Sequence, residues 1–99
     1  MRIWLDDIRP MQPGYDIHCV TAHEALSHIR LGKCTAISFD HDLGEGPTGY
    51  DVACEIERLA FEGYICRIEW KVHSANPVGR ANIIAAMKSA QRGWHVNGL

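Results

Sequence analysis

Short apolar runs and longer amphipathic stretches alternate along this chain. Four segments have the β-branched and aromatic composition of strands, namely residues 2–5, 16–20, 35–39 and 66–72. In the last of them apolar and charged residues strictly alternate, so one of its faces should be exposed, as in an edge strand. The chain therefore opens with a strand and carries three more.

Three further segments have apolar residues at helical spacing, and each follows a residue that caps helices well. The expected helices are residues 22–31, from Thr48 to about Ala60, and residues 77 to about 91. Thr21 and Thr48 each have an acidic residue three positions later, which is the pattern of a capping box. Asn76 precedes a proline that suits the first helical turn.

Glycines are expected to end these helices at Gly32, Gly63 and Gly93. On the last helix the predicted core residues are Ile84, Ala85 and Met87. Residues 94–99 would then form a tail, with a short last strand as one option.

The order of these elements predicts one α/β domain spanning residues 1–99, with a small, mainly parallel open sheet in strand order 2-1-3-4. Right-handed crossovers place all three helices on one face of that sheet. Trp4 falls on the other face. We expect the loop 6–15 and the tail to cover it, with a second copy of the chain as the alternative.

Composition excludes several classes of protein. A net charge of −2 without a basic run gives no footprint for long nucleic acid. The apolar runs are too short to span a membrane, and the early acidic pair argues against a secretory signal, so we expect a cytoplasmic protein. The cysteines show no Cys-x-x-Cys pairing and are expected to be buried thiols: Cys19, Cys34, Cys54 and Cys66.

Ionisable residues follow three of the predicted strands directly. They are Asp6 and Asp7, then Asp40, His41 and Asp42, then His73 with Ser74. An open α/β sheet gathers ligand groups at the carboxyl ends of its strands, so these segments should converge. Carboxylates held close together favour a hard divalent cation. Taken alone, the central Asp-x-Asp is better explained as a solvated turn with a helix cap.

Three motifs together resemble a known family. They are residues 4–10 (WLDDIRP), residues 40–44 (DHDLG) with 48–51 (TGYD), and residues 73–79 (HSANPVG) with Asn82. The acidic pair, the aspartate after the third strand and the small hydroxyl residue after the fourth resemble receiver domains in general. The closer resemblance is to cyclic-phosphate processing receiver domains, and it spans nearly the whole chain.

The resemblance implies a reduced flavodoxin-like or receiver-like fold and action on cyclic phosphates, either small molecules or RNA termini. Asp6, Asp7 and Asp40 would hold Mg²⁺ or Mn²⁺. The implied catalytic residues are His41, His73 and Asp40, with the two histidines as base and acid in either order. The matching motifs add three substrate-binding residues, Asp42, Ser74 and Asn76. Arg80 is added only because it lies close to them in the sequence.

The chain departs from signalling receivers in two ways. We find no fifth strand carrying the lysine that contacts the phosphoryl group, and the segment between the first two strands is too short for the usual first helix. Phosphorelay signalling is therefore disfavoured. A non-catalytic receiver-like module that binds a metal or phosphate stays open as the alternative function, and both monomer and homodimer stay open.

Overall fold

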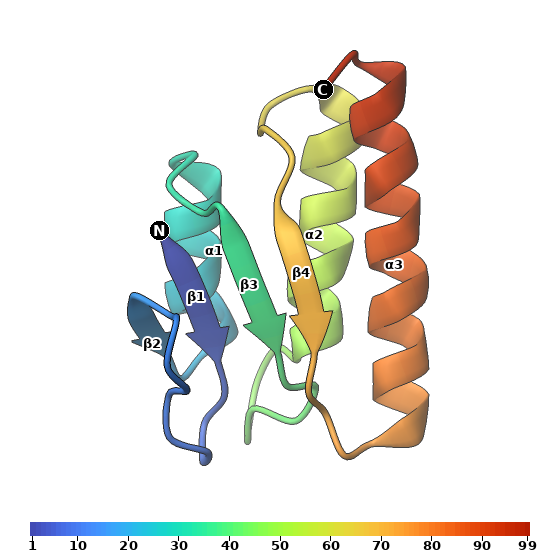
Figure 1. Cartoon of the computed structure of the whole chain (residues 1–99). Coiled ribbons are helices and arrows are strands. Elements are labelled where there is room, and N and C mark those ends of the chain that lie inside the picture. Colours follow the sequence, from blue (N-terminus) through green and yellow to red (C-terminus); the bar gives the residue numbers. More distant parts are fainter.

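A computed structural model describes residues 1–99 and has the expected α/β architecture. Its strands are β1 (Arg2–Leu5), β2 (Ile17–Cys19), β3 (Ala36–Phe39) and β4 (Glu69–Val72). All three strand pairs are parallel, and the order across the sheet is β2-β1-β3-β4 (Figure 1). The predicted strand order is confirmed, and the fold is a reduced receiver-like one.

The helices are α1 (Ala22–Arg30), α2 (Gly49–Glu62) and α3 (Pro77–Val96). Their predicted caps are present, because Thr21, Thr48 and Asn76 each accept a hydrogen bond from a backbone N–H of the first turn. Figure 1 shows α1 and α2 behind the sheet and α3 alongside α2, beyond β4. No helix lies in front of the sheet, which agrees with the one-sided arrangement that right-handed crossovers predict.

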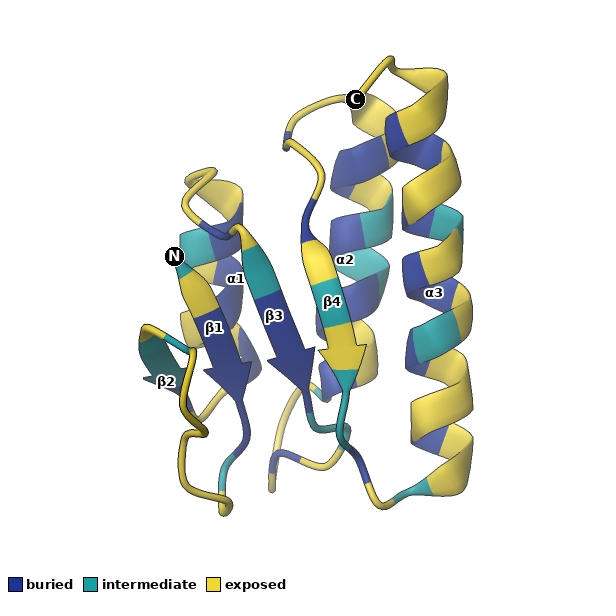
Figure 2. Ribbon diagram, viewed as in Figure 1, coloured by how far each residue is buried: buried dark blue, intermediate teal, exposed yellow.

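The hydrophobic core lies between the sheet and the helices. Its central side chains are fully or almost fully buried: Ile3, Leu5, Ile37, Phe39, Val52, Ile56, Ile83 and Met87. In Figure 2 the buried positions of α2 and α3 face each other and the sheet, while their outer sides are exposed. Burial of this apolar surface is the main force that holds the strands in register.

The strand β4 begins at Glu69, three residues later than the sequence predicts. Its only partner is β3, where Ala36 pairs with Glu69, and the amide of Glu69 donates to the carbonyl of Thr35 at 3.0 Å. Residues 66–68 extend beyond the start of β3, so no neighbouring strand can bond to them. The alternation of apolar and charged residues in this segment reflects the burial of Ile68 and not hydrogen bonds to a neighbouring strand.

The helix α3 continues past Gly93 to Val96, so the predicted stop and the predicted last strand are both wrong. Gly93 is buried where α3 crosses α2, and a Cβ there would lie 2.8 Å from Cδ2 of Phe61. Trp94 is fully buried and donates to the carbonyl of Ile65 at 3.1 Å. The glycine allows two helices to approach and does not end one.

The buried face of α3 also differs from the prediction by one residue. Ile83 and Ala86 are buried along with Met87, whereas Ile84 is half-buried and Ala85 is exposed. Because α3 packs mainly on α2, its buried stripe follows that helix rather than the sheet.

Trp4 is only 6% exposed although it lies on the face without helices. Tyr15, from the loop before β2, packs edge-on against it with ring centroids 5.3 Å apart, and His73 stacks on it at 4.0 Å. The expected cover by the loop is confirmed. The tail plays no part, because its residues up to Val96 belong to α3.

All four cysteines are free, but only two are buried as expected. Burial raises the pKa of Cys19 to about 11 and that of Cys34 to about 12, so neither is a ready thiolate. Cys54 is half-buried and Cys66 is exposed, since Cys66 precedes β4 instead of belonging to it. None of the helices combines the length and the apolar character needed to cross a membrane.

The crossing of α2 and α3 generates a stability prediction. Gly93→Ala should destabilise the fold by about 1–3 kcal/mol, because the added methyl group meets the ring and backbone of Phe61. This outcome opposes helix propensity, which favours alanine by roughly 1 kcal/mol. Urea unfolding measures the change, with the exposed Lys88→Ala on the same helix as control. A Gly93→Ala variant as stable as the wild type would contradict the close contact.

Candidate functional site

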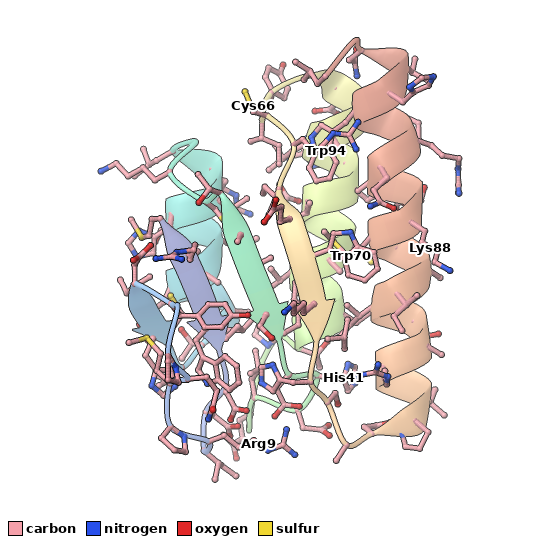
Figure 3. All side chains as sticks on the ribbon, viewed as in Figure 1. Arg9, His41, Cys66, Trp70, Lys88 and Trp94 are labelled. Atoms are coloured by element: carbon pink, nitrogen blue, oxygen red, sulfur yellow. The ribbon has the colours of Figure 1, made fainter.

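The carboxyl ends of β1, β3 and β4 meet at one edge of the sheet, as the sequence predicts. Asp6, Asp7 and Asp40 each place one carboxylate oxygen within 4.8 Å of the others. In Figure 3 the labelled Arg9 and His41 lie at this same end of the molecule, far from Trp94. We call Asp6, Asp7 and Asp40 the acidic cluster.

Asp6 is fully buried, and protein groups hold both of its oxygens. Its Oδ1 accepts from the backbone N–H of Ile8 at 2.8 Å and of Arg9 at 2.7 Å, and its Oδ2 lies 2.9 Å from Nε2 of His73. Burial alone would raise the pKa of Asp6, but these hydrogen bonds outweigh it and hold the pKa below its ordinary value. Asp6 is therefore a fixed carboxylate at neutral pH.

Asp7 and Asp40 are half-buried and less fully engaged. Oδ1 of Asp40 accepts from the backbone N–H of His41 at 2.8 Å, whereas Oδ1 of Asp7 is buried with no hydrogen-bond partner. A buried carboxylate oxygen without a partner is costly in a cluster of like charges, and a bound cation would remove that cost. The acidic cluster thus fits a divalent cation with oxygen ligands.

His41 follows Asp40 directly and packs against the first turn of α3. Its Nδ1 is buried without a partner. A Cβ at Gly79 would lie 2.3 Å from Cγ of His41, so only glycine leaves room for the ring. The residue is half-buried, and no protein group occupies either ring nitrogen. His41 is thus placed by packing and not by hydrogen bonds from its ring.

His73 has a different environment, since the protein occupies both of its ring nitrogens. Nε2 faces Oδ2 of Asp6 at 2.9 Å, and Nδ1 faces Oγ of Ser38 at 2.7 Å. The ring lies parallel to Trp4, with 4° between their planes. His73 is thus tied to β1 and β3 at once.

The remaining candidates connect the loops to the start of α3. Oδ1 of Asn76 accepts from the amide of Gly79 at 3.0 Å, and its Nδ2 reaches Oδ2 of the exposed Asp42 at 3.4 Å. Oγ of the buried Ser74 accepts from the amide of Asn76 at 3.1 Å. Arg80 donates to the carbonyl of Val72 and is not among the groups that contact the acidic cluster.

Three residues of this edge were not among the site residues predicted from the sequence: Arg9, Ser38 and Trp4. Arg9 is exposed, and its guanidinium donates to the carbonyl of His73. Its position in the first motif, two residues after the acidic pair, was a usable signal. Ser38 gave none, because its hydrogen bond depends on how β3 and β4 are aligned.

The largest depression lies elsewhere, on the open face of the sheet. It has a volume of about 620 Å³ and is lined by residues such as Arg2, Tyr15, Ile37 and Lys71. A second one lies beside α3, between Trp70 and Ile84. Neither contains a residue of the acidic cluster, so the cluster lies outside both depressions, at the edge of the sheet.

Comparison with known families agrees with this geometry. The sequence model of the cyclic-phosphate processing receiver domain matches residues 1–89 of the 99-residue chain. The chain belongs to this family. No curated protein and no solved structure gives a significant match. The family name places this receiver domain in the context of cyclic-phosphate processing, and the matched range includes the whole acidic edge.

The acidic cluster of this receiver domain generates a binding prediction. Mg²⁺ or Mn²⁺ at 100 times its Kd should stabilise the fold by about 2.7 kcal/mol, since the ion binds the folded chain alone. Thermal unfolding with and without the ion measures this shift. Asp7→Asn combined with Asp40→Asn should abolish it, whereas Asp42→Asn, an exposed change in the same loop, should not. A wild-type melting temperature that does not respond, or an equal response in the double variant, removes the site.

Proposed function

We propose that this receiver domain hydrolyses a cyclic phosphodiester with the help of a divalent cation, Mg²⁺ or Mn²⁺. The observation that carries the proposal is the acidic cluster itself, with its unpartnered oxygen on Asp7, next to a histidine whose ring nitrogens are free. Membership of the cyclic-phosphate processing family supports the choice of substrate.

Asp6, Asp7 and Asp40 would hold the cation. When bound, such an ion neutralises phosphate charge and lowers the pKa of water. The three residues are not equivalent in this role. Asp6 is already fixed by three donors, whereas Asp7 has an oxygen that nothing else engages, so Asp7 gains most from a cation.

His41 is the residue best suited to move a proton. In the reaction a water oxygen forms a bond to phosphorus and one ring P–O ester bond breaks. The water loses a proton, and the leaving alkoxide gains one. His41 borders Asp40 and has no protein partner on its ring nitrogens, and imidazole is the side chain most often used for such proton transfers. The family resemblance assigns the second of these proton transfers to His73. Because protein groups engage both ring nitrogens of His73, a water molecule is the simpler group for that second transfer.

The phosphate would be held by donors around the rim. Arg9 is exposed beside the acidic cluster and uses one N–H on the carbonyl of His73, which leaves further donors of its planar fork for phosphate oxygens. Ser74 and Asn76, at the start of α3, are the other binding candidates. Arg80 lies one turn into the same helix and bonds to Val72, so it is the more distant candidate.

The position of the acidic cluster outside both depressions also bears on the substrate, because no enclosing pocket limits the size of the molecule that carries the phosphate. A nucleotide and an RNA terminus with a cyclic phosphate are therefore the substrate classes to compare. A cytoplasmic location and the choice between monomer and homodimer stay predictions from the sequence.

A phosphorus NMR screen tests the proposed activity. Wild-type protein with Mn²⁺ should open one of the 2′,3′-cyclic, 3′,5′-cyclic or 1″,2″-cyclic phosphates to a monoester. His41→Ala should slow that reaction by about 10² to 10⁴-fold, the usual contribution of general acid–base catalysis. His23→Ala, an exposed histidine on α1, is the matched control and should leave the rate unchanged.

Two results would decide against this mechanism. Protein that binds Mn²⁺ but opens none of the three cyclic phosphates would favour the non-catalytic binding module. A His41→Ala variant with the wild-type rate would show that His41 transfers no proton.

Arg9 generates a separate kinetic prediction. Loss of a charge-assisted hydrogen bond costs about 1.5–3 kcal/mol, so Arg9→Ala should raise KM by roughly 10- to 100-fold and change kcat less. Steady-state kinetics on the substrate found in the screen measure both constants. Arg80→Ala provides the comparison and should have the smaller effect. An unchanged KM for Arg9→Ala would exclude Arg9 from the phosphate site.

A further inference from the structure

We infer that His73 is a positioning residue, which with Ser38 fixes the Asp6 carboxylate in the orientation that a cation requires. The inference rests on the proposed metal site but not on the proposed reaction. It assigns His73 a role different from the acid or base that the sequence motif suggests. It also gives a role to Ser38, a buried polar residue that the sequence left unexplained.

A chain of hydrogen bonds joins residues at the ends of β1 and β4 to one within β3. Oδ2 of Asp6, after β1, lies 2.9 Å from Nε2 of His73, after β4. Nδ1 of His73 lies 2.7 Å from Oγ of Ser38, on β3. Each bond has the length of a good hydrogen bond, and together they use both nitrogens of the ring.

The chemistry of the groups sets the direction of these bonds. An ionised carboxylate can only accept, so Nε2 of His73 carries the hydrogen that faces Asp6. In the neutral ring Nδ1 then accepts, and the hydroxyl of Ser38 donates to it. This tautomer follows from the hydrogen-bond network. Ser38 therefore keeps the N–H of His73 directed at Asp6.

Packing prevents the ring from turning away. Trp4 stacks on His73 with ring centroids 4.0 Å apart and 4° between the planes, and its own Nε1 donates to the carbonyl of Arg9 at 3.2 Å. The guanidinium of Arg9 in turn donates to the carbonyl of His73. The ring and the main chain of His73 are thus both held.

The same three residue types occur in serine hydrolases, but this arrangement does not fit nucleophilic catalysis. Ser38 is only 2% exposed and lies within β3, so no substrate can reach its hydroxyl. A nucleophile must contact the substrate. The chain of Ser38, His73 and Asp6 therefore serves the buried carboxylate of Asp6.

The consequence for Asp6 is a carboxylate that cannot rotate. The amides of Ile8 and Arg9 fix Oδ1, and His73 fixes Oδ2. The two amides use both lone pairs of Oδ1, but Oδ2 keeps one lone pair beyond its bond to His73, so the group can still bind a cation through Oδ2 beside Asp7 and Asp40. Partners that orient metal ligands in this way typically contribute about 10- to 100-fold to metal affinity.

Two substitutions of His73 separate positioning from proton transfer. In His73→Gln the side-chain amide N–H reaches the place of Nε2 and can still donate to Asp6. In His73→Asn the shorter amide reaches only the place of Nδ1, beside Ser38. Neither side chain titrates near neutral pH, so neither can act as an acid or base.

The measurement is Mn²⁺ affinity, by isothermal titration calorimetry or by electron paramagnetic resonance of free Mn²⁺. His73→Asn should lose about 10- to 100-fold in affinity, and His73→Gln should recover most of that loss. His18→Ala is the control, since His18 also contacts Asp6 but through the backbone carbonyl, at 2.7 Å. Its Mn²⁺ affinity should match the wild type.

Ser38→Ala provides the second test, in case the changes at His73 prevent folding. It leaves His73 in place and removes only its outer partner, and it should lower Mn²⁺ affinity less than His73→Asn does. Circular dichroism without metal checks that each variant is folded. Unchanged affinity in both Ser38→Ala and His73→Asn, or equal losses in His73→Gln and His73→Asn, would overturn the inference.

Failure of the positioning role of His73 can be distinguished from failure of the proposed function. Protein that binds Mn²⁺ and shows the Gln and Asn difference, but opens no cyclic phosphate, would keep the positioning role and end the hydrolase proposal. Wild-type protein that binds no Mn²⁺ at all would overturn both.

Discussion

The parallel register of β1 and β3 is the constraint on which the acidic edge depends. Leu5 pairs with Phe39, and the amide of Asp40 donates to the carbonyl of Leu5 at 2.8 Å. Residues that follow the two central strands therefore leave the sheet side by side, and Asp6 and Asp40 cannot move apart. A slip of one residue would turn buried side chains such as Leu5 toward the open face. Burial of the core thus holds the carboxylates together.

This forced proximity has a cost, and the molecule offsets it unevenly. Asp6 receives two backbone N–H groups and His73, and its pKa is lowered despite complete burial. A folded-state pKa below the unfolded one means that Asp6 favours folding above its ordinary pKa of 3.8, and that this stabilisation is lost as pH falls through the folded-state value. Asp7 receives no such donor on Oδ1. Among the carboxylates of the acidic cluster, the cost of burying an oxygen without a hydrogen bond therefore falls on Oδ1 of Asp7.

Local signals in the sequence predicted much of this structure. Strand order, helix starts and the convergence of Asp6, Asp7 and Asp40 follow from alternation, capping residues and the rule for strand ends. The prediction for Gly93 is wrong because a glycine that ends a helix and a glycine at a close helix crossing give the same signal in the sequence. Only the contact with Phe61 distinguishes the two. The bond from Ser38 to His73 was missed for a related reason, since it joins residues 35 positions apart. The local sequence pattern does not indicate which side chains meet across strands.

His41 and His73 follow neighbouring strands of the sheet, but their side chains have different surroundings. His73 leaves β4 within the layer of the sheet, where Trp4 and Ser38 are close enough to hold its ring. His41 leaves β3 toward α3, and because β4 is the last strand of the sheet, the first turn of that helix can lie against the loop. The contact at Gly79 places the ring by shape alone and uses no hydrogen bond. His41 is thus held without a hydrogen bond from its ring, whereas protein groups engage both ring nitrogens of His73, so the two histidines of this edge differ in what fixes them.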